Sequence, residues 1–269
     1  MGESAEPRVA SLSSAQTPKD MVAVVGLPIA TMIGLVVVWE LAVTAFKVPE
    51  YILVAPSAFL VRTWESRALL WDNAFVTGTE ILVGFFAATL FSIPLALVIA
   101  SSRFVERAFY PLIVFFQLIP KIAIAPLFIV WFGFDLFPKV LMTFLLCFFP
   151  TLVASMTGFK SLDPRILYIT RSMGAGRLQT FRFVRLPSAL PYIFSGLRVS
   201  IVFAATGALV GEFVGANSGL GYLLLRATSY LDTSLIFACL VVLSVMGLLF
   251  SYAVTAVENL VMPWQKKEG

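Results

Sequence analysis

Apolar residues in this 269-residue chain gather into long runs that short polar segments separate. A bilayer core about 30 Å thick needs roughly 20 residues of helix, and backbone polar groups inside lipid must be satisfied within their own segment. The pattern therefore predicts an all-α membrane protein in which each long run is one transmembrane helix. The six predicted spans cover residues 21–46, 75–101, 108–134, 137–159, 189–214 and 234–257.

Two segments beside the first predicted span differ from it in composition. Residues 1–20 are polar and rich in Ala and Ser, which predicts a disordered cytoplasmic tail ahead of a membrane domain over 21–264. The run at 21–46 is too long for a signal-peptide core and ends in no small-residue cleavage site, so we expect it to be a permanent span. The amphipathic stretch 57–70 predicts a helix lying along the outer interface.

The composition agrees with a membrane protein and excludes several kinds of chemistry. Hydrophobic residues make up 59% of the chain and charged residues only 13%, whereas about 25% of a soluble domain is charged. The absence of histidine excludes acid–base catalysis and metal ligation by that residue. Cys147 and Cys239 both lie inside apolar runs, so we interpret them as small packing residues and not as a disulfide or a metal pair.

Basic residues in the loops predict the orientation in the membrane. The loop 160–188 holds six basic residues and a single acidic one, Asp163. With that loop in the cytoplasm, both termini are cytoplasmic as well, and the outer side holds fewer cations. The cations that this orientation assigns to outer loops are Lys47, Arg62, Arg67, Lys139 and Arg226.

The loop 160–188 also has the pattern of a short amphipathic helix. Asp163 and Pro164 suit a helix start, and Gly174 and Gly176 can end the helix in a left-handed turn. Pro187 and Pro191 are expected to break the chain before the fifth span. The apolar stripe between start and end consists of Leu162, Ile166, Ile169 and Met173. From these features alone, the helix could equally lie on anionic lipid headgroups.

The spacing within this loop resembles a known family. Gly174, followed after nine residues by Val184 and then by Leu186-Pro187, is similar to the conserved cytoplasmic loop of ATP-binding-cassette importer permeases. The resemblance implies a coupling helix that docks into a groove on a separate ATPase subunit. The residues that it assigns to coupling are Asp163, Pro164, Tyr168, Arg171, Gly174, Ala175, Gly176, Leu186 and Pro187.

Two further segments resemble the nitrate/sulfonate/taurine branch of that family. Residues 119–127, with Trp131-Phe132-Gly133, are similar to its third span, and residues 210–215 with 219–222 are similar to the end of its fifth span. The loop and the outer segment look nearest to members that handle pyrimidine or flavin precursors or aromatic acids. The resemblance implies the type I importer fold in the inner membrane, two permease copies, an ATPase dimer and an extracytoplasmic solute-binding protein.

The chain departs from the family pattern at two places. The family's Glu-Ala-Ala triplet falls on Tyr168, Ile169 and Thr170, and none of the three matches, so the contact made by that glutamate is not carried over. Glu80 stands where the family commonly has Arg.

The chain contains no Gly-x-x-x-x-Gly-Lys-Ser/Thr phosphate loop. We therefore expect no enzyme activity and no cofactor in this chain, with ATP and Mg²⁺ bound by the partner subunit. An alternative is an autonomous secondary carrier or channel, which would need ion-coupling or selectivity residues of its own at mid-bilayer. A membrane scaffold with no transport role is a further alternative, which a costly charge within a span argues against.

Ionisable residues inside the predicted spans are candidates for the translocation pathway. Lys121 follows Pro120 deep in the third span, so we expect it to line the pathway, to pair within the bundle or to be exposed at an irregular helix break. Glu212 and Glu80 are predicted either to pair with an outer-loop cation such as Arg226 or to form the outer gate. The pathway and gate residues predicted from the sequence are Pro120, Lys121 and Glu212. For Arg198 we expect snorkelling toward the cytoplasmic headgroups.

Overall fold

The computed structural model describes residues 18–264, which fall into two units, the first ending at Ala58 and the second beginning at Phe59. In the first unit, helix α1 (Pro18–Ala45) begins inside the tail predicted for residues 1–20, and residues 1–17 of that tail lie outside the described part. The Glu40 carboxylate accepts hydrogen bonds from the Ser57 amide at 3.0 Å and the Ser57 hydroxyl at 2.7 Å. This pair ties the end of α1 to the start of α2 (Pro56–Glu65).

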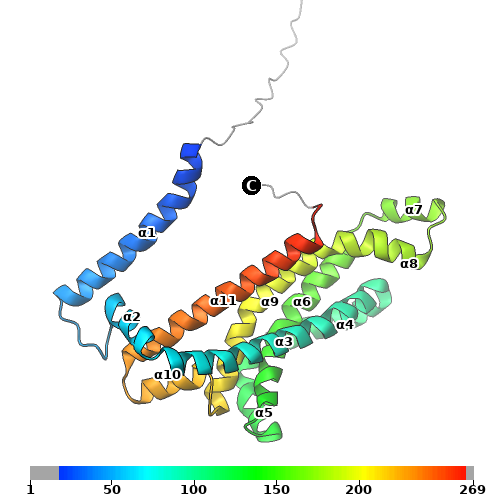
Figure 1. The fold of residues 1–269 in the computed structure, drawn as a ribbon. Helices are drawn as coiled ribbons and strands as arrows, with labels where there is room; N and C mark the ends of the chain where they lie inside the picture. The colour runs from blue at the N-terminus through cyan, green and yellow to red at the C-terminus, as the bar shows by residue number, and fades with distance from the viewer. Residues whose placement is uncertain (1–17, 265–269) are drawn as a thin grey trace, which may run out of the picture. The chain divides into compact units, whose positions relative to one another are not determined.

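The second unit is built from four long apolar helices that lie side by side in Figure 1. These are α3 (Arg67–Ser101), α6 (Leu136–Lys160), α9 (Leu186–Gly215) and α11 (Thr233–Val261), and each is long and apolar enough to cross a membrane. Gly84 of α3 and Gly207 of α9 approach Thr143 of α6 so closely that a Cβ on either would overlap it. Small residues at such contacts are typical of membrane helices, where packing replaces the hydrophobic effect.

The predicted third span, 108–134, is not one straight helix. It consists of α4 (Arg103–Leu118), a 3₁₀ turn η1 (Lys121–Ile124) and α5 (Ala125–Phe132), with a bend of 76° between its two halves. The cause is Pro120, because a residue before proline is driven to extended backbone. Ile119 has that conformation, with φ −65° and ψ 127°.

The described residues therefore contain four uninterrupted candidate spans, or five with the bent pair counted as one. The predicted first span corresponds to α1, whose apolar described part, Ile29–Ala45, is shorter than a full span. Its crossing of the membrane stays a prediction. The stretch 57–70, expected to form one interfacial helix, is divided between α2 and the start of α3.

The loop predicted at 160–188 is shorter than expected. Helix α7 (Pro164–Ser172) is followed by α8 (Arg177–Thr180), and the chain then stays helical through a π-turn η2 (Phe181–Arg185) into α9. The predicted chain break at Pro187 and Pro191 is thus wrong. Pro187 occupies the first turn of α9, where proline is well tolerated, and Pro191 lies inside that helix.

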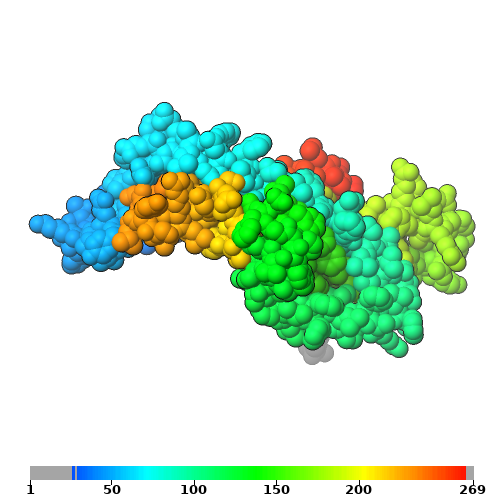
Figure 2. Space-filling model, turned by 90° about the horizontal axis from the view of Figure 1, so that it is seen from below, coloured from blue at the N-terminus to red at the C-terminus, as the bar shows by residue number. Residues whose placement is uncertain are grey.

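The two ends of the second unit carry different elements. Figure 1 places α7 and α8 at one end, and α5 and α10 (Leu220–Ser229) at the other. Figure 2 shows α7 and α8, in yellow-green, projecting beyond the neighbouring helices. A tight turn precedes α10, and Gly219 in that turn has φ +111°.

Candidate functional site

Helix α7 begins as the sequence predicts. Asp163 is its N-cap, with a side-chain oxygen that accepts the Arg165 amide at 2.8 Å, and Pro164 holds the first helical position. A side-chain cap of this kind satisfies one of the free N–H groups of the first turn. The start of the helix is therefore fixed by local interactions and requires no contact with the bundle.

Helix α7 ends at Gly174 in a Schellman motif. The Gly174 amide donates to Arg171 O at 3.0 Å and the Ala175 amide donates to Thr170 O at 3.1 Å, which are the two bonds of that motif. Gly174 has φ +78°, as predicted for a left-handed turn. Gly176 does not share this conformation; with φ −68° it precedes α8, and its amide donates to Gln179 Oε1.

The face of α7 that points away from the bundle is apolar, and no described residue covers it. Ile166 and Ile169 are exposed, and Met173 is 80% exposed. Tyr168 is 76% exposed on the same helix. Leu186 and Pro187, which the sequence assigned to the same coupling element, lie half-buried at the root of α9 and not on this face. Exposed apolar residues gathered on a projecting helix are typical of a docking surface.

Lys121 lies at the helix break, beside a groove of about 400 Å³ between α4, α6 and α9. Its ammonium donates to Gln117 O at 3.1 Å and lies 4.9 Å from the centre of the Phe149 ring. No carboxylate of the described residues forms a salt bridge with it. The walls are mainly apolar, with Leu146, Phe149, Val153, Val199 and Phe203, and the polar residues Gln117 and Ser195 also line them. Pro120 is exposed and forms the bend without lining the groove.

Glu212 belongs to a different site from Lys121 and does not line the same groove. It is 1% exposed near the end of α9 and accepts hydrogen bonds from Thr77 Oγ1 at 2.6 Å and from the Gly221 amide. A Cβ at Gly219 would overlap the Glu212 carboxyl group. Glu212 thus ties α3 and the turn before α10 to α9, and the expected pairing with Arg226 is absent among the described ion pairs.

Glu80 pairs with a cation, as the sequence predicted, but the cation is Lys139 and not Arg226. Lys139 Nζ lies 2.8 Å from Glu80 Oε1, and both side chains are buried between α3 and α6. The assignment of Lys139 to an outer loop is therefore wrong. Opposite charges inside two apolar runs are a signal that could have suggested the pairing, because an intramembrane charge needs a partner.

Arg198 is likewise paired. Its guanidinium lies 3.0 Å from the Glu258 carboxylate of α11, which forms an ion pair between helices. Snorkelling of Arg198 toward the headgroups stays a prediction. Among the described residues no group of His, Cys, Asp and Glu side chains could hold a metal ion, and Cys147 and Cys239 are free and buried.

Comparisons with known proteins give a family. The model described as "Binding-protein-dependent transport system inner membrane component" matches residues 81–267. The formylaminopyrimidine transport permease protein ThiX of Halalkalibacterium halodurans is 38% identical over 87% of this chain and 94% of its own. The riboflavin transport system permease protein RibX of Chloroflexus aurantiacus is 36% identical over 96% of this chain and 95% of its own. The taurine transport system permease protein TauC of Escherichia coli is 29% identical over 89% of this chain and 90% of its own.

A solved structure has a similar fold. An inward-facing conformation of the MetNI methionine ABC transporter matches with a TM-score of 0.61 and 18% identity, over 73% of this chain and 98% of that chain. A second crystal form matches with a TM-score of 0.64 and 20% identity.

Proposed function

Because this chain belongs to the family of inner membrane components of binding-protein-dependent transport systems, we propose which solute it moves and how its movement is driven. The chain is the permease subunit of an ATP-binding-cassette transporter for a small solute, with the type I importer fold. The resemblance found in the sequence is thereby confirmed, including its branch.

The driving force enters through α7. Two permease copies associate with a dimer of ATPase subunits, which bind ATP and Mg²⁺, and α7 docks into each ATPase. The observation that carries this proposal is the projecting, capped helix with its uncovered apolar face. Closure of the ATPases on ATP moves α7. This movement switches the translocation cavity between the two permease copies from inward-facing to outward-facing, a rigid-body transition between two states.

The solute is a small organic anion, of the sulfonate or taurine kind, or a heteroaromatic precursor. Support comes from Lys121, a cation without a carboxylate partner that faces a mainly apolar, partly aromatic groove. Such a charge is costly in a membrane unless a cavity or a partner compensates it. An anionic group would meet the ammonium, and a flat ring would pack against Phe149 and Phe203.

The solute arrives from an extracytoplasmic binding protein at the end that carries α10, and both termini lie in the cytoplasm. The basic residues near α7 and α8 support this orientation. Glu212 acts at the outer gate through the turn that it holds before α10.

Matched tyrosine variants test the docking of α7. Tyr168 on α7 and Tyr230 beyond α10 are both 76% exposed, so they differ in position and not in accessibility. In co-purification of the permease with its ATPase from membranes, Tyr168→Ser should reduce the ATPase recovered by about tenfold, a change of about 1.4 kcal/mol. Tyr230→Ser should leave the recovery unchanged. Equal recovery for both variants and the wild type would remove α7 as the docking element.

A further inference from the structure

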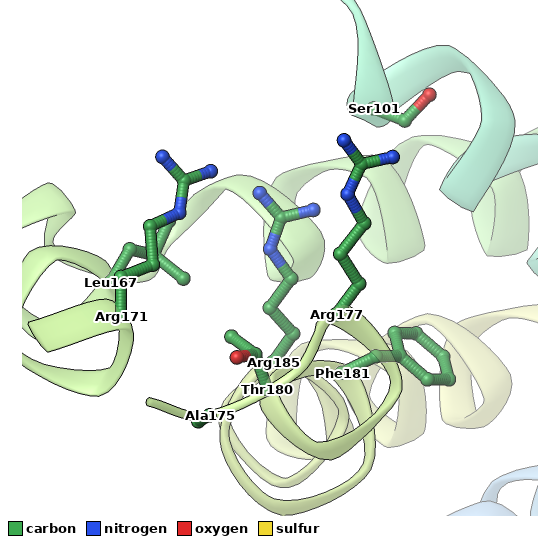
Figure 3. A pocket seen from close by; sticks show the side chains of 8 residues that line it. All are labelled: Ser101, Leu167, Arg171, Ala175, Arg177, Thr180, Phe181 and Arg185. Atoms are coloured by element: carbon green, nitrogen blue, oxygen red, sulfur yellow. The ribbon is translucent and has the colours of Figure 1, made fainter. Parts of the chain in front are cut away.

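Three arginines line one pocket between α7 and the helix that follows it. Arg171 comes from the last turn of α7, Arg177 from the start of α8 and Arg185 from the end of the π-turn η2. The pocket has a volume of about 570 Å³. Figure 3 shows the three guanidinium groups side by side and pointing the same way, with the Ser101 hydroxyl beside Arg177. The remaining lining residues are Leu167, Ala175, Thr180 and Phe181.

The three charges lack a counter-ion within the described chain. No carboxylate of the described residues forms a salt bridge with any of the three guanidinium groups. Asp163 is the only acidic residue from 160 to 188, and it caps α7. Glu106, at the same end of the unit, is paired with Lys160. Like charges this close repel one another, so the arrangement favours an anion in the pocket.

The chemistry and position of the pocket indicate which anion it suits. Guanidinium groups present planar pairs of N–H donors that match phosphate oxygens, and several of them around one cavity are typical of phosphate recognition. Ser101 is the last residue of α3, a helix long and apolar enough to cross a membrane, so the pocket lies at one end of a candidate span. Basic pockets between membrane helices on the cytoplasmic side bind anionic headgroups.

We propose that the pocket formed by Arg171, Arg177 and Arg185 binds a phosphate group, carried by an anionic phospholipid headgroup or by free inorganic phosphate. A phosphate there contacts α7 on one side and α8 with η2 on the other. Its binding therefore fixes the position of α7 relative to the root of α9. This site is separate from the apolar face of α7 and from the Lys121 groove.

Binding to the full-length chain in neutral detergent tests the proposal. Native mass spectrometry measures bound phosphatidylglycerol, with phosphatidylcholine as the control lipid. Calorimetry measures the binding of sodium phosphate, with sodium chloride as the control salt. The test variant is the double substitution Arg177→Gln with Arg185→Gln. The matched control is Arg165→Gln with Arg182→Gln, which removes the same charge from the same loop outside the pocket. We expect the pocket variant to weaken binding at least about tenfold and the control to leave it unchanged.

The two arms distinguish the source of the phosphate. Tight phosphatidylglycerol binding without phosphate binding assigns the pocket to a lipid headgroup, and saturable phosphate binding assigns it to the free ion. The variant Arg177→Lys with Arg185→Lys should keep part of the affinity, because the charge remains while the paired donors are lost. Binding of neither probe, or equal weakening in the pocket and control variants, overturns the proposal. If neither binds and the pocket variant releases the ATPase, the pocket receives an acidic side chain of that subunit instead.

Discussion

At the scale of single residues, charges inside the apolar helices are held by specific partners. Glu80 with Lys139 joins α3 to α6, and Arg198 with Glu258 joins α9 to α11. A buried charge that loses its partner is strongly destabilising, whereas the intact pair is close to neutral. Lys121 differs from these residues, because it faces a groove without a carboxylate. This difference is why we assign a transport role to Lys121 and a structural role to the paired charges.

Removal of the Glu212 carboxyl group should destabilise the outer end of the second unit. Glu212→Ala leaves the Gly221 amide without its acceptor and leaves the Thr77 hydroxyl with only the longer hydrogen bond to Asn73 O at 3.2 Å. A buried amide left unsatisfied costs about 1–3 kcal/mol. We expect a lower thermal unfolding temperature in detergent and a smaller decrease for Glu212→Gln, which keeps one oxygen acceptor. The same unfolding temperature for Glu212→Ala and the wild type would contradict the structural role.

Lys121→Ala should impair transport without impairing assembly. Loss of the one cation in the groove is expected to raise the KM for an anionic solute by about tenfold, equivalent to about 1.4 kcal/mol. Lys121→Arg, which retains the charge, should be affected less. Solute uptake is the measurement, and recovery of the assembled complex is the control. A Lys121→Ala variant with wild-type rate and affinity would make the residue a structural cation.

Gly174→Val should displace α7 while leaving the membrane helices intact. Open space surrounds Gly174, so the substitution acts through the backbone conformation at φ +78° and not through a clash. That conformation costs most residues about 1–2 kcal/mol, and a β-branched side chain is especially unsuited to it. We expect membrane insertion with reduced ATPase association and reduced ATP hydrolysis, whereas Gly174→Asn, which tolerates the conformation, should behave as the wild type. Normal association and hydrolysis for Gly174→Val would contradict the coupling role.

These residues also show what the sequence can and cannot predict. Asp163 and Gly174 act on neighbours within a few positions, so local rules predicted their roles correctly. Lys139 and Glu80 are 59 positions apart, and Glu258 was not considered as a partner for Arg198. Such pairs depend on which helix faces meet, and that is decided by the packing of the whole bundle.

At the scale of elements, prolines have opposite effects in two parts of the chain. Ile119 is extended before Pro120 and the helix bends by 76°, but α9 continues through Pro191. Just before Pro187 the helix widens into the π-turn η2, in which the Leu186 amide donates to Phe181 O, and the chain stays helical. The sequence predicted the reverse, a continuous span through Pro120 and a break at Pro187 and Pro191, because the effect of a proline depends on neighbouring turns and helices.

Cysteine labelling tests the orientation of these elements. Asp163→Cys at the start of α7 should be labelled by a membrane-impermeant reagent only from the cytoplasmic side, and Asn217→Cys, before α10, only from outside. Both positions are exposed, and the two native cysteines are buried and give little background. Labelling of Asp163→Cys from outside in sealed cells would reverse the orientation.

At the scale of the whole molecule, composition and run length predicted the membrane fold because lipid imposes strict requirements on helix length and polarity. The solute is less accessible to such reasoning. The groove beside Lys121 supplies one charge and an apolar wall, and a second permease copy and the binding protein contribute the rest of the selection in our proposal. The relatives ThiX, RibX and TauC differ in the solutes that their names state, within one family.

The most direct test of ATP-driven transport is solute uptake into proteoliposomes that contain the permease and its binding protein, with and without the ATPase subunit. The solutes are taurine, an alkanesulfonate and a pyrimidine precursor, each radiolabelled. We expect uptake only when the ATPase is present and ATP is supplied on its side of the membrane. Uptake without the ATPase, driven by an imposed ion gradient, would contradict the proposed mechanism and favour an autonomous carrier.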